Sequence, residues 1–176
     1  SPFYDSDLYV KGEIVSILDI PEGTKFINNI TFDHCRSLTT VNFPKSAEVI
    51  CCGAFSNCYN LKTMNLNSIK KIGDEAFAYD DNIETVYYNS IDDWVNIEFG
   101  GYSSNPLRNG ADLLINGNIV TEYAYPDTTK IIKKYIFAGY KRLSKVTLPE
   151  YLEVIGDAAF YGCEGLTSIN LPESIR

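Results

Sequence analysis

The side chains in this chain that could form a nucleophilic site are five cysteines and one histidine. A cysteine nucleophile needs a nearby base to remove its proton, and His34 is the only histidine that could serve. His34 stands between Phe32 and Cys35, in a short polar stretch that we expect to be an exposed loop. We therefore predict no catalysis by a cysteine and histidine pair.

The adjacent carboxylates Asp92 and Asp93 are the second candidate for chemistry, as a general acid and base. A glycosidase places its two carboxyl groups on either side of the bond that it cleaves. Adjacent residues on a helix do not face each other, and both lie in the first turn of a short helix predicted over Ser90 to Phe99. Ser90 can cap that helix, and acidic residues favour its positive N-terminal end. We interpret this pair as helix capping.

Motifs for cofactors and metals are also missing from the sequence. It contains no glycine-rich phosphate loop and no metal-ligand cluster. The adjacent pair Cys51 and Cys52 lacks the C-x-x-C spacing of a zinc or redox site. We predict that the chain is not an enzyme and holds no cofactor and no metal.

The charge and hydropathy of the chain disfavour two classes of partner. The 176 residues carry a formal net charge of −8, with no basic block. Nucleic acid and anionic membrane surfaces are both bound through Lys and Arg, so we expect neither. No apolar run approaches the roughly 20 residues that span a bilayer, so we expect no membrane insertion.

The elements that must position any site come from a repeated unit, seen most clearly in Ile155 to Pro172, IGDAAFYGCEGLTSINLP. Counted from Ile155, the marked residues of this unit stand at offsets 4, 5, 8, 11, 14, 16 and 17: Ala159, Phe160, Cys163, Leu166, Ile169, Leu171 and Pro172. The same spacing restarts, with departures, at four other isoleucines: Ile27, Ile50, Ile72 and Ile132. The steps from 27 to 50 and from 132 to 155 are both 23 residues. A fixed period of this size indicates a solenoid or a related array.

A longer repeat lies over the first. Asp7 to Pro21 reads DLYVKGEIVSILDIP, and Asp112 to Pro126 reads DLLINGNIVTEYAYP. The shift is 112 − 7, or 105 residues, and it also carries Phe55 to Phe160. The chain therefore contains a larger module, once in full and once in part.

Each coil is predicted to contain a strand at offsets 12 to 16. Because side chains alternate along a strand, offsets 14 and 16 should point inward and offsets 13 and 15 outward. The A-F-x-x-C part is expected to form a helical or 3₁₀ turn, or a short strand, on the opposite side. One coil buries too little apolar surface alone, so neighbouring coils must stack into one core. We predict coils near residues 7–26, 27–49, 50–71, 72–88, 112–131, 132–154 and 155–176.

Two sets of buried side chains follow from the register. One is a single ladder of phenylalanines at offset 5: Phe32, Phe55, Phe77, Phe137 and Phe160. The other is a set of cysteines at offset 8, which we interpret as packing groups rather than disulfide or metal partners: Cys35, Cys58 and Cys163.

Residues 89–111 interrupt the period, and we interpret them as an insertion that leaves the stack. The helix over Ser90 to Phe99 should pack on the edge or convex side of the solenoid with Trp94 buried, and Gly100 to Asn105 should be mobile. The strand of Asp112 to Pro126 should rejoin the same sheet beside Val86, so that one solenoid comprises residues 1–176.

The pattern I-G-x-x-A-F-x-x-C-x-x-L-x-x-I-x-L-P resembles the BspA-type, or Treponema-type, leucine-rich repeat. Ile155 to Pro172 matches it at every marked position. The resemblance implies a right-handed leucine-rich-repeat superhelix with a parallel β-sheet on one face. Such proteins are typically large secreted or surface proteins of bacteria and of some mucosal parasites. The resemblance thus implies binding or adhesion at the cell surface, and it supplies no catalytic residues. Since the chain opens at SPFYDSD and closes inside a repeat, we expect it to be a segment of a longer protein.

The outward face of the strands is the predicted binding surface, because solenoids bind partners on such extended faces. Its candidate residues occupy offsets 13 and 15: Asn42, Asn65, Thr63, Thr85, Tyr87, Thr147 and Asn170. Tyr87 is the expected hot spot, since Tyr is enriched at such positions. The alternative is that these threonines and asparagines are only the soluble surface of a strand.

Three functions remain open from the sequence. The first is recognition of a host protein or another cell-surface protein through a continuous polar and aromatic strand face. The second is a structural spacer, in which no surface patch stands out. The third is a carbohydrate-binding module, which requires a localised aromatic platform with polar groups nearby.

Overall fold

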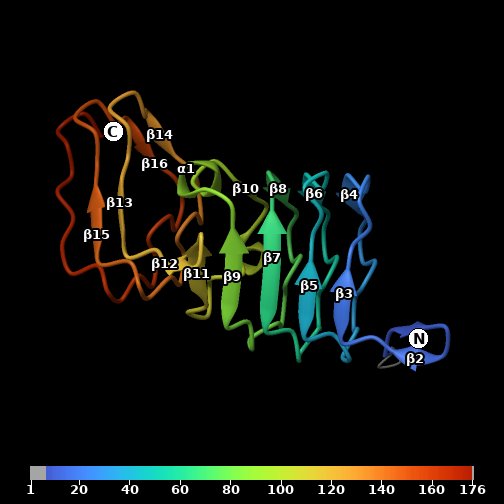
Figure 1. Cartoon of the computed structure of the whole chain (residues 1–176). Helices are drawn as coiled ribbons and strands as arrows, with labels where there is room; N and C mark the ends of the chain where they lie inside the picture. Colours follow the sequence, from blue (N-terminus) through green and yellow to red (C-terminus); the bar gives the residue numbers. More distant parts are fainter. Residues whose placement is uncertain (1–6, 176) are drawn as a thin grey trace.

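The computed structural model describes residues 7–175, which wind into a solenoid of stacked coils with the two ends of the chain at opposite ends of the stack (Figure 1). Short strands line two sides of the stack, here called the front and the back. The front strands are β3 (Ile17–Asp19), β5 (Thr40–Asn42), β7 (Thr63–Asn67), β9 (Thr85–Tyr88), β11 (Asp112–Ile115), β12 (Asn118–Ile119), β13 (Glu122–Ala124) and β15 (Lys145–Thr147). The back strands are β4 (Phe26–Ile27), β6 (Val49–Ile50), β8 (Lys71–Ile72), β10 (Glu98–Phe99), β14 (Ile131–Ile132) and β16 (Val154–Ile155). This confirms the predicted leucine-rich-repeat solenoid with a parallel sheet on one face.

The front sheet has six strands in the order β12-β11-β9-β7-β5-β3, all parallel except β12. The predicted inward position, offset 14, sets its register. Val41 pairs with Met64, Met64 with Val86 and Val86 with Leu113. All four side chains are fully buried, because alternate residues of a strand face the core.

The back of the solenoid is also a sheet rather than a row of helices. Ile27, Ile50, Ile72 and Phe99 occupy one register across β4, β6, β8 and β10. The stretches that follow each of these strands form turns, with one 3₁₀ helix, η1 (Tyr102–Ser104). The A-F-x-x-C part lies in these turns, and the short back strand of each coil comes just before it.

Residues 89–111 do not leave the stack, which corrects the interpretation of this segment as an insertion. Phe99 pairs with Ile72 on the back, and Leu113, 14 residues later, pairs with Val86 on the front. Residues 99–115 are therefore a coil with the same offsets as its neighbours. Gly100 makes the close stacking possible, because a Cβ at this position would clash with the backbone of Asp74.

The helix α1 (Ile91–Trp94) lies in the connection from β9 to β10 (Figure 1). Ser90 caps it as predicted, accepting a hydrogen bond from the Asp93 backbone N–H. Trp94 is fully buried, also as predicted, with its ring against Phe99. Asn105, predicted to end a mobile loop, is fully buried instead.

The front sheet does not continue through the whole chain. The segment Asp112 to Pro126 is predicted to rejoin the sheet beside Val86. Its first strand, β11, does so, but within residues 7–175 β13 pairs only with β15, in a separate sheet. The reason is β12, which turns back antiparallel to β11 with Leu114 opposite Ile119 and so covers the free edge of β11. The apolar core nevertheless continues across this break as one cluster.

Strands that lie 105 residues apart in the sequence correspond to one another in the structure. The hairpin of β1 (Tyr9–Val10) and β2 (Glu13–Ile14) corresponds to residues 114–115 and 118–119, which form the hairpin of β11 and β12. The same shift relates β3 to β13, β4 to β14, β5 to β15 and β6 to β16. The hairpin is therefore a recurring element of the larger module.

The phenylalanine ladder is divided into two stacks. Phe55 stacks on Phe32 and Phe77, with centroids 5.1 Å and 6.0 Å apart, and Phe137 stacks on Phe160 at 6.1 Å. Between the stacks, the coil that begins at Phe99 has a serine at offset 5, so no ring connects Phe77 to Phe137. The rings of Phe32 and Phe160 are half-buried, because each lies in a coil at one end of the described stack, where no further coil covers it.

Candidate recognition surfaces

Amide side chains form a hydrogen-bonded row on the outward face of the front sheet. Asn42 Nδ2 donates to Asp19 Oδ1 at 2.6 Å, and Asn65 Nδ2 donates to Asn42 Oδ1. The parallel register places these offset-15 residues on adjacent strands, where neighbouring side chains can bond. Asn42 and Asn65 are half-buried and bind each other, so they stabilise the sheet as well as present a surface.

Beyond Asn65 the same row becomes aromatic and then aliphatic. Asn65 pairs with Tyr87, Tyr87 with Leu114 and Leu114 with Ile119. Tyr87 is 38% exposed and Ile119 is 43% exposed, while Leu114 is half-buried between them. We call these three residues the front patch. Leu114 and Ile119 were missed from the sequence, although Leu114 stands 15 residues after Phe99, at the offset that Tyr87 occupies in its own coil.

The threonines at offset 13 form a half-buried row along the sheet, and this row ends in a charge pair. Thr63 pairs with Thr85, and Thr85 with Asp112. The Arg142 guanidinium Nε donates to Asp112 Oδ1 at 2.8 Å. This pair ties the coil that begins at Ile132 to the edge of the six-stranded sheet.

The structure does not bring Thr147 and Asn170 into the six-stranded sheet. Thr147 lies on β15 beside Ala124, beyond the break made by β12. Asn170 lies in a segment with no assigned strand, and a cavity of about 470 Å³ separates Ser168 to Asn170 from β15. The predicted binding residues thus belong to two surfaces. Thr147 and Asn170 line this cavity, and the six-stranded sheet carries the others: Asn42, Asn65, Thr63, Thr85 and Tyr87.

Side chains replace backbone hydrogen bonds where the coil at Phe99 meets the coil at Ile132. Elsewhere the N–H at offset 5 donates to the carbonyl at offset 4 of the next coil, as from Phe55 to Ala76 at 2.9 Å. Here that acceptor is Ile136 O, and it receives the indole Nε1 of Trp94 at 3.1 Å. The Asn105 amide donates in the same way to Tyr135 O. We call this side-chain junction the seam.

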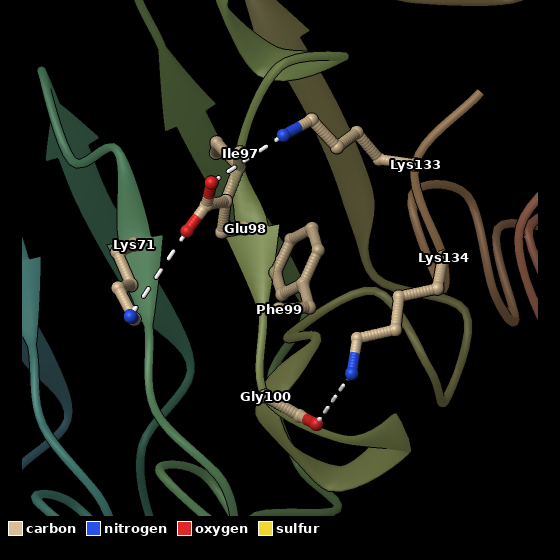
Figure 2. Close-up of a pocket in the computed structure, with 7 residues that line it drawn as sticks. All are labelled: Lys71, Ile97, Glu98, Phe99, Gly100, Lys133 and Lys134. Carbon is tan, nitrogen blue, oxygen red and sulfur yellow. Dashed lines mark hydrogen bonds and ion pairs between the residues drawn. The ribbon is translucent and has the colours of Figure 1, made fainter. Parts of the chain in front are cut away.

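A cavity of about 360 Å³ opens at the back of the seam (Figure 2). Its walls are the outer edge of β10 and the residues that follow β14: Lys71, Ile97, Glu98, Phe99, Gly100, Lys133 and Lys134. Figure 2 shows Glu98 between two lysines, with Lys71 at 4.0 Å and Lys133 at 3.4 Å. The Lys134 ammonium donates to the carbonyl oxygen of Gly100 at 3.1 Å.

A buried carboxyl group lies in the core near the cysteines. Asp80 takes the offset-8 position of its coil, where Cys58 and Cys163 donate their thiols to phenylalanine carbonyls at 3.1 Å. Within residues 7–175 neither oxygen of Asp80 has a hydrogen-bond partner, and Arg108 Nη1 has none either. Burial raises the pKa of Asp80 to about 8, and the Cys58 backbone and the Arg108 guanidinium offset this only in part.

The residues first considered for catalysis are not arranged for it. His34 is half-buried rather than exposed, with Nδ1 at 2.9 Å from its neighbour Asp33. Burial, and then the charge of Asp33, raise the pKa of the Cys35 thiol, which disfavours the reactive thiolate. Asp92 Oδ1 accepts a hydrogen bond from the Tyr123 hydroxyl at 2.8 Å. In the described part of the chain, no group of three or more His, Cys, Asp or Glu side chains could hold a metal ion.

Comparison with known proteins identifies the repeat. The family model described as the BspA type leucine rich repeat region matches residues 7–101 and 115–176, in six copies. The chain belongs to this family. This BspA-type match omits residues 102–114, which lie within the divergent coil that begins at Phe99. No curated protein matches the chain.

Solved structures similar to this BspA-type chain come from several bacteria. They include the pneumococcal vaccine antigen PcpA, which is 23% identical and matches over 98% of this chain and 55% of its own, with a TM-score of 0.47. A leucine-rich repeat protein from Eubacterium ventriosum is 18% identical over 92% of this chain and 55% of its own, with a TM-score of 0.47. The leucine-rich repeat protein of T. pallidum is 18% identical over 90% of this chain and 71% of its own, with a TM-score of 0.40. The chain therefore spans about half the length of the first two. Among residues 7–175, no helix has the length and apolar character needed to cross a membrane.

Proposed function

We propose that this chain is a non-catalytic recognition module of a secreted or cell-surface bacterial protein, and that it binds a partner protein through the front patch. The front patch carries the proposal, because Tyr87, Leu114 and Ile119 form a contiguous aromatic and aliphatic surface beside the polar Asn and Thr rows of the sheet. A rigid aromatic residue beside aliphatic ones is typical of an interface centre. The neighbouring Asn and Thr rows supply a polar rim. The family is generally non-enzymatic and contains repeats suited to protein interactions.

The partner we propose is a protein of a host cell or of another cell. The chain carries a net charge of −8, so nucleic acid and anionic lipid are poor candidates. A spacer would not need the front patch, since contiguous exposed apolar side chains typically mark an interaction site.

A carbohydrate partner is the second candidate, and one observation favours it. The exposed rings of Tyr102 and Tyr161 lie 5.9 Å apart on the turn side of the coils. They meet edge to face at an interplanar angle of 78°, so they do not form one flat platform for a sugar ring. This geometry makes the front patch the better-supported site.

Binding to mucosal epithelial cells tests the proposal. We expect the labelled chain to bind intact cells, and protease treatment of the cells to abolish binding. Replacing Tyr87 by Ala and Ile119 by Asp together should weaken binding at least about tenfold, by removing a hot spot and placing a charge in an apolar contact. The matched control is Tyr151→Ala, which removes an exposed tyrosine elsewhere.

Three results would contradict the proposed function. The carbohydrate module would be indicated if periodate treatment of the cells abolished binding and the Tyr102→Ala variant bound more weakly. Binding unchanged by the front-patch variant would place the interface elsewhere. No binding to any cell would favour the spacer.

A further inference from the structure

The backbone ladder on the back of the solenoid stops at the seam and restarts on the other side. On each side, the N–H at offset 1 donates to the carbonyl at offset 0 of the preceding coil. Gly100 N–H donates to Ile72 O at 2.8 Å, and Gly156 N–H donates to Ile132 O at 2.9 Å. At the seam the equivalent bond would run from Lys133 N–H to Phe99 O. Within residues 7–175, β10 pairs only with β8, and β14 only with β16.

Two open strand edges therefore face the same cavity. Backbone groups point alternately to the two sides of a strand. Since Gly100 N–H donates toward β8, the N–H and C=O of Phe99 point toward the seam. The carbonyl of Ile132 accepts a hydrogen bond from the residue directly after β16. By the same alternation, the backbone N–H and C=O groups of Ile131 and Lys133 point toward β10. The cavity of about 360 Å³ lies between these edges (Figure 2).

The seam does not need this space to hold together. Trp94, Asn105 and Tyr140 already connect the two sides through buried hydrogen bonds to backbone carbonyls. Bonds that cross the cavity come from the exposed lysines. Lys134 reaches Gly100 O, and Lys133 reaches Glu98. Long exposed lysine side chains can be displaced at small cost, since exposed ion pairs contribute about 0–1 kcal/mol.

The positive charge of the cavity favours the binding of an acidic segment. Three lysines and one glutamate line it, which is a local charge of 3 − 1, or +2, on a chain of net −8. Within the described residues, Glu98 is shared by Lys71 and Lys133, and Lys134 has no carboxylate within ion-pair distance. An added strand would meet Phe99 with its inward side chains and the lysines with its outward ones.

We propose that the seam is a strand-addition site, at which an extended acidic peptide segment of a partner protein inserts between β10 and β14. Backbone hydrogen bonds from Phe99 and Lys133 hold the segment, as in other β-augmentation complexes. Acidic side chains at alternate positions replace Glu98 as partners of Lys133 and supply one for Lys134. The site is separate from the front patch and lies on the opposite sheet.

A labelled heptapeptide that alternates glutamate and valine is the probe, with fluorescence anisotropy at low salt as the measurement. We expect saturable binding to the wild-type chain. The double variant Lys133→Glu and Lys134→Glu should weaken it at least about tenfold. Lys45→Glu, which makes the same charge change at an exposed site outside the seam, should have little effect. The Tyr87→Ala variant should also bind normally, which separates this site from the proposed front-patch function.

A second peptide tests strand addition itself. N-methylation at every second residue keeps the charge but removes the amide donors on one edge, and it should weaken binding at least about tenfold. Nuclear magnetic resonance should show the amide signals of Phe99 and Lys133 shifting with the unmodified peptide. Equal binding of the N-methylated peptide, equal binding of a lysine and valine peptide, or no binding to the wild-type chain would each overturn the proposal.

Discussion

The indole nitrogen of Trp94 donates a hydrogen bond of 3.1 Å to the carbonyl oxygen of Ile136, 42 residues further along the chain. This contact joins two stacks of coils that no strand ladder connects within residues 7–175. The ring packs between Tyr88 and Phe99, so its donor is held toward the seam. A side chain from the connection between β9 and β10 thus completes the coil that begins at Ile132.

Replacing Trp94 by Phe tests how much this hydrogen bond contributes to the free energy of unfolding. The change keeps an aromatic ring but leaves the Ile136 carbonyl without its donor. We expect the free energy of unfolding to fall by about 1–3 kcal/mol, the usual cost of an unsatisfied buried group. Urea unfolding followed by circular dichroism measures it. The exposed-ring variant Tyr79→Phe should unfold like the wild type, and equal stability of both variants would mean that the bond is not needed.

Phe55 is the central ring of the first phenylalanine stack, with neighbours on both sides. Phe55→Ala should cost about 3–5 kcal/mol, because it leaves a cavity in a fully packed core. Phe26 offers a matched control, since its ring is 58% exposed on the back sheet. Phe26→Ala should lower the melting temperature far less. A similar loss in both variants would contradict the assigned register.

Asp80 predicts an unusual dependence of stability on pH. Its pKa is about 8 in the folded chain, against an ordinary value of 3.8. The folded state therefore holds this proton more tightly than the unfolded state. The stabilisation from protonated Asp80 is complete below about pH 4 and is lost as the pH rises to about 8.

The variant Asp80→Asn isolates this effect, because an amide of the same shape cannot ionise. We expect the variant to be more stable than the wild type at pH 8, by on the order of 2 kcal/mol, with the difference shrinking toward pH 4. Thermal unfolding across this range measures the difference. Asp127→Asn, at an exposed carboxylate, should show no such trend. A stability difference that is constant with pH would show that Asp80 is ionised in the fold.

The cysteines should remain unbridged, as the sequence predicts, and they are free thiols in the structure. Cys52 is exposed, whereas Cys35, Cys58 and Cys163 are buried, and burial raises the pKa of Cys163 to about 11. Alkylation without reductant should therefore modify Cys52 in the folded chain and the buried three only after unfolding. Mass spectrometry that found a Cys35 to Cys58 bridge would contradict this prediction.

The sequence predicts the repeating coil, its inward and outward offsets, the buried Trp94 and the 105-residue module, because all of these depend on side-chain types at fixed local spacing. The sequence pattern does not reveal the coil at residues 99–115, because it carries Ser104 where the other coils carry phenylalanine and Gly110 where they carry leucine or isoleucine. One signal was available. Phe99 and Gly100 repeat the apolar residue and glycine of Ile72 and Gly73 at the start of the preceding coil.

The sequence by itself therefore determined the solenoid, the family and the side of each strand that faces the core, since strand alternation is a local property of the chain. Tertiary structure alone decided where the stack is divided. A strand edge is open or closed according to which distant segment reaches it, and spacing does not encode that. It is β12 that closes the edge of β11, and Trp94 that stands in for a backbone donor at the seam. Both the front patch and the cavity between β10 and β14 result from that division.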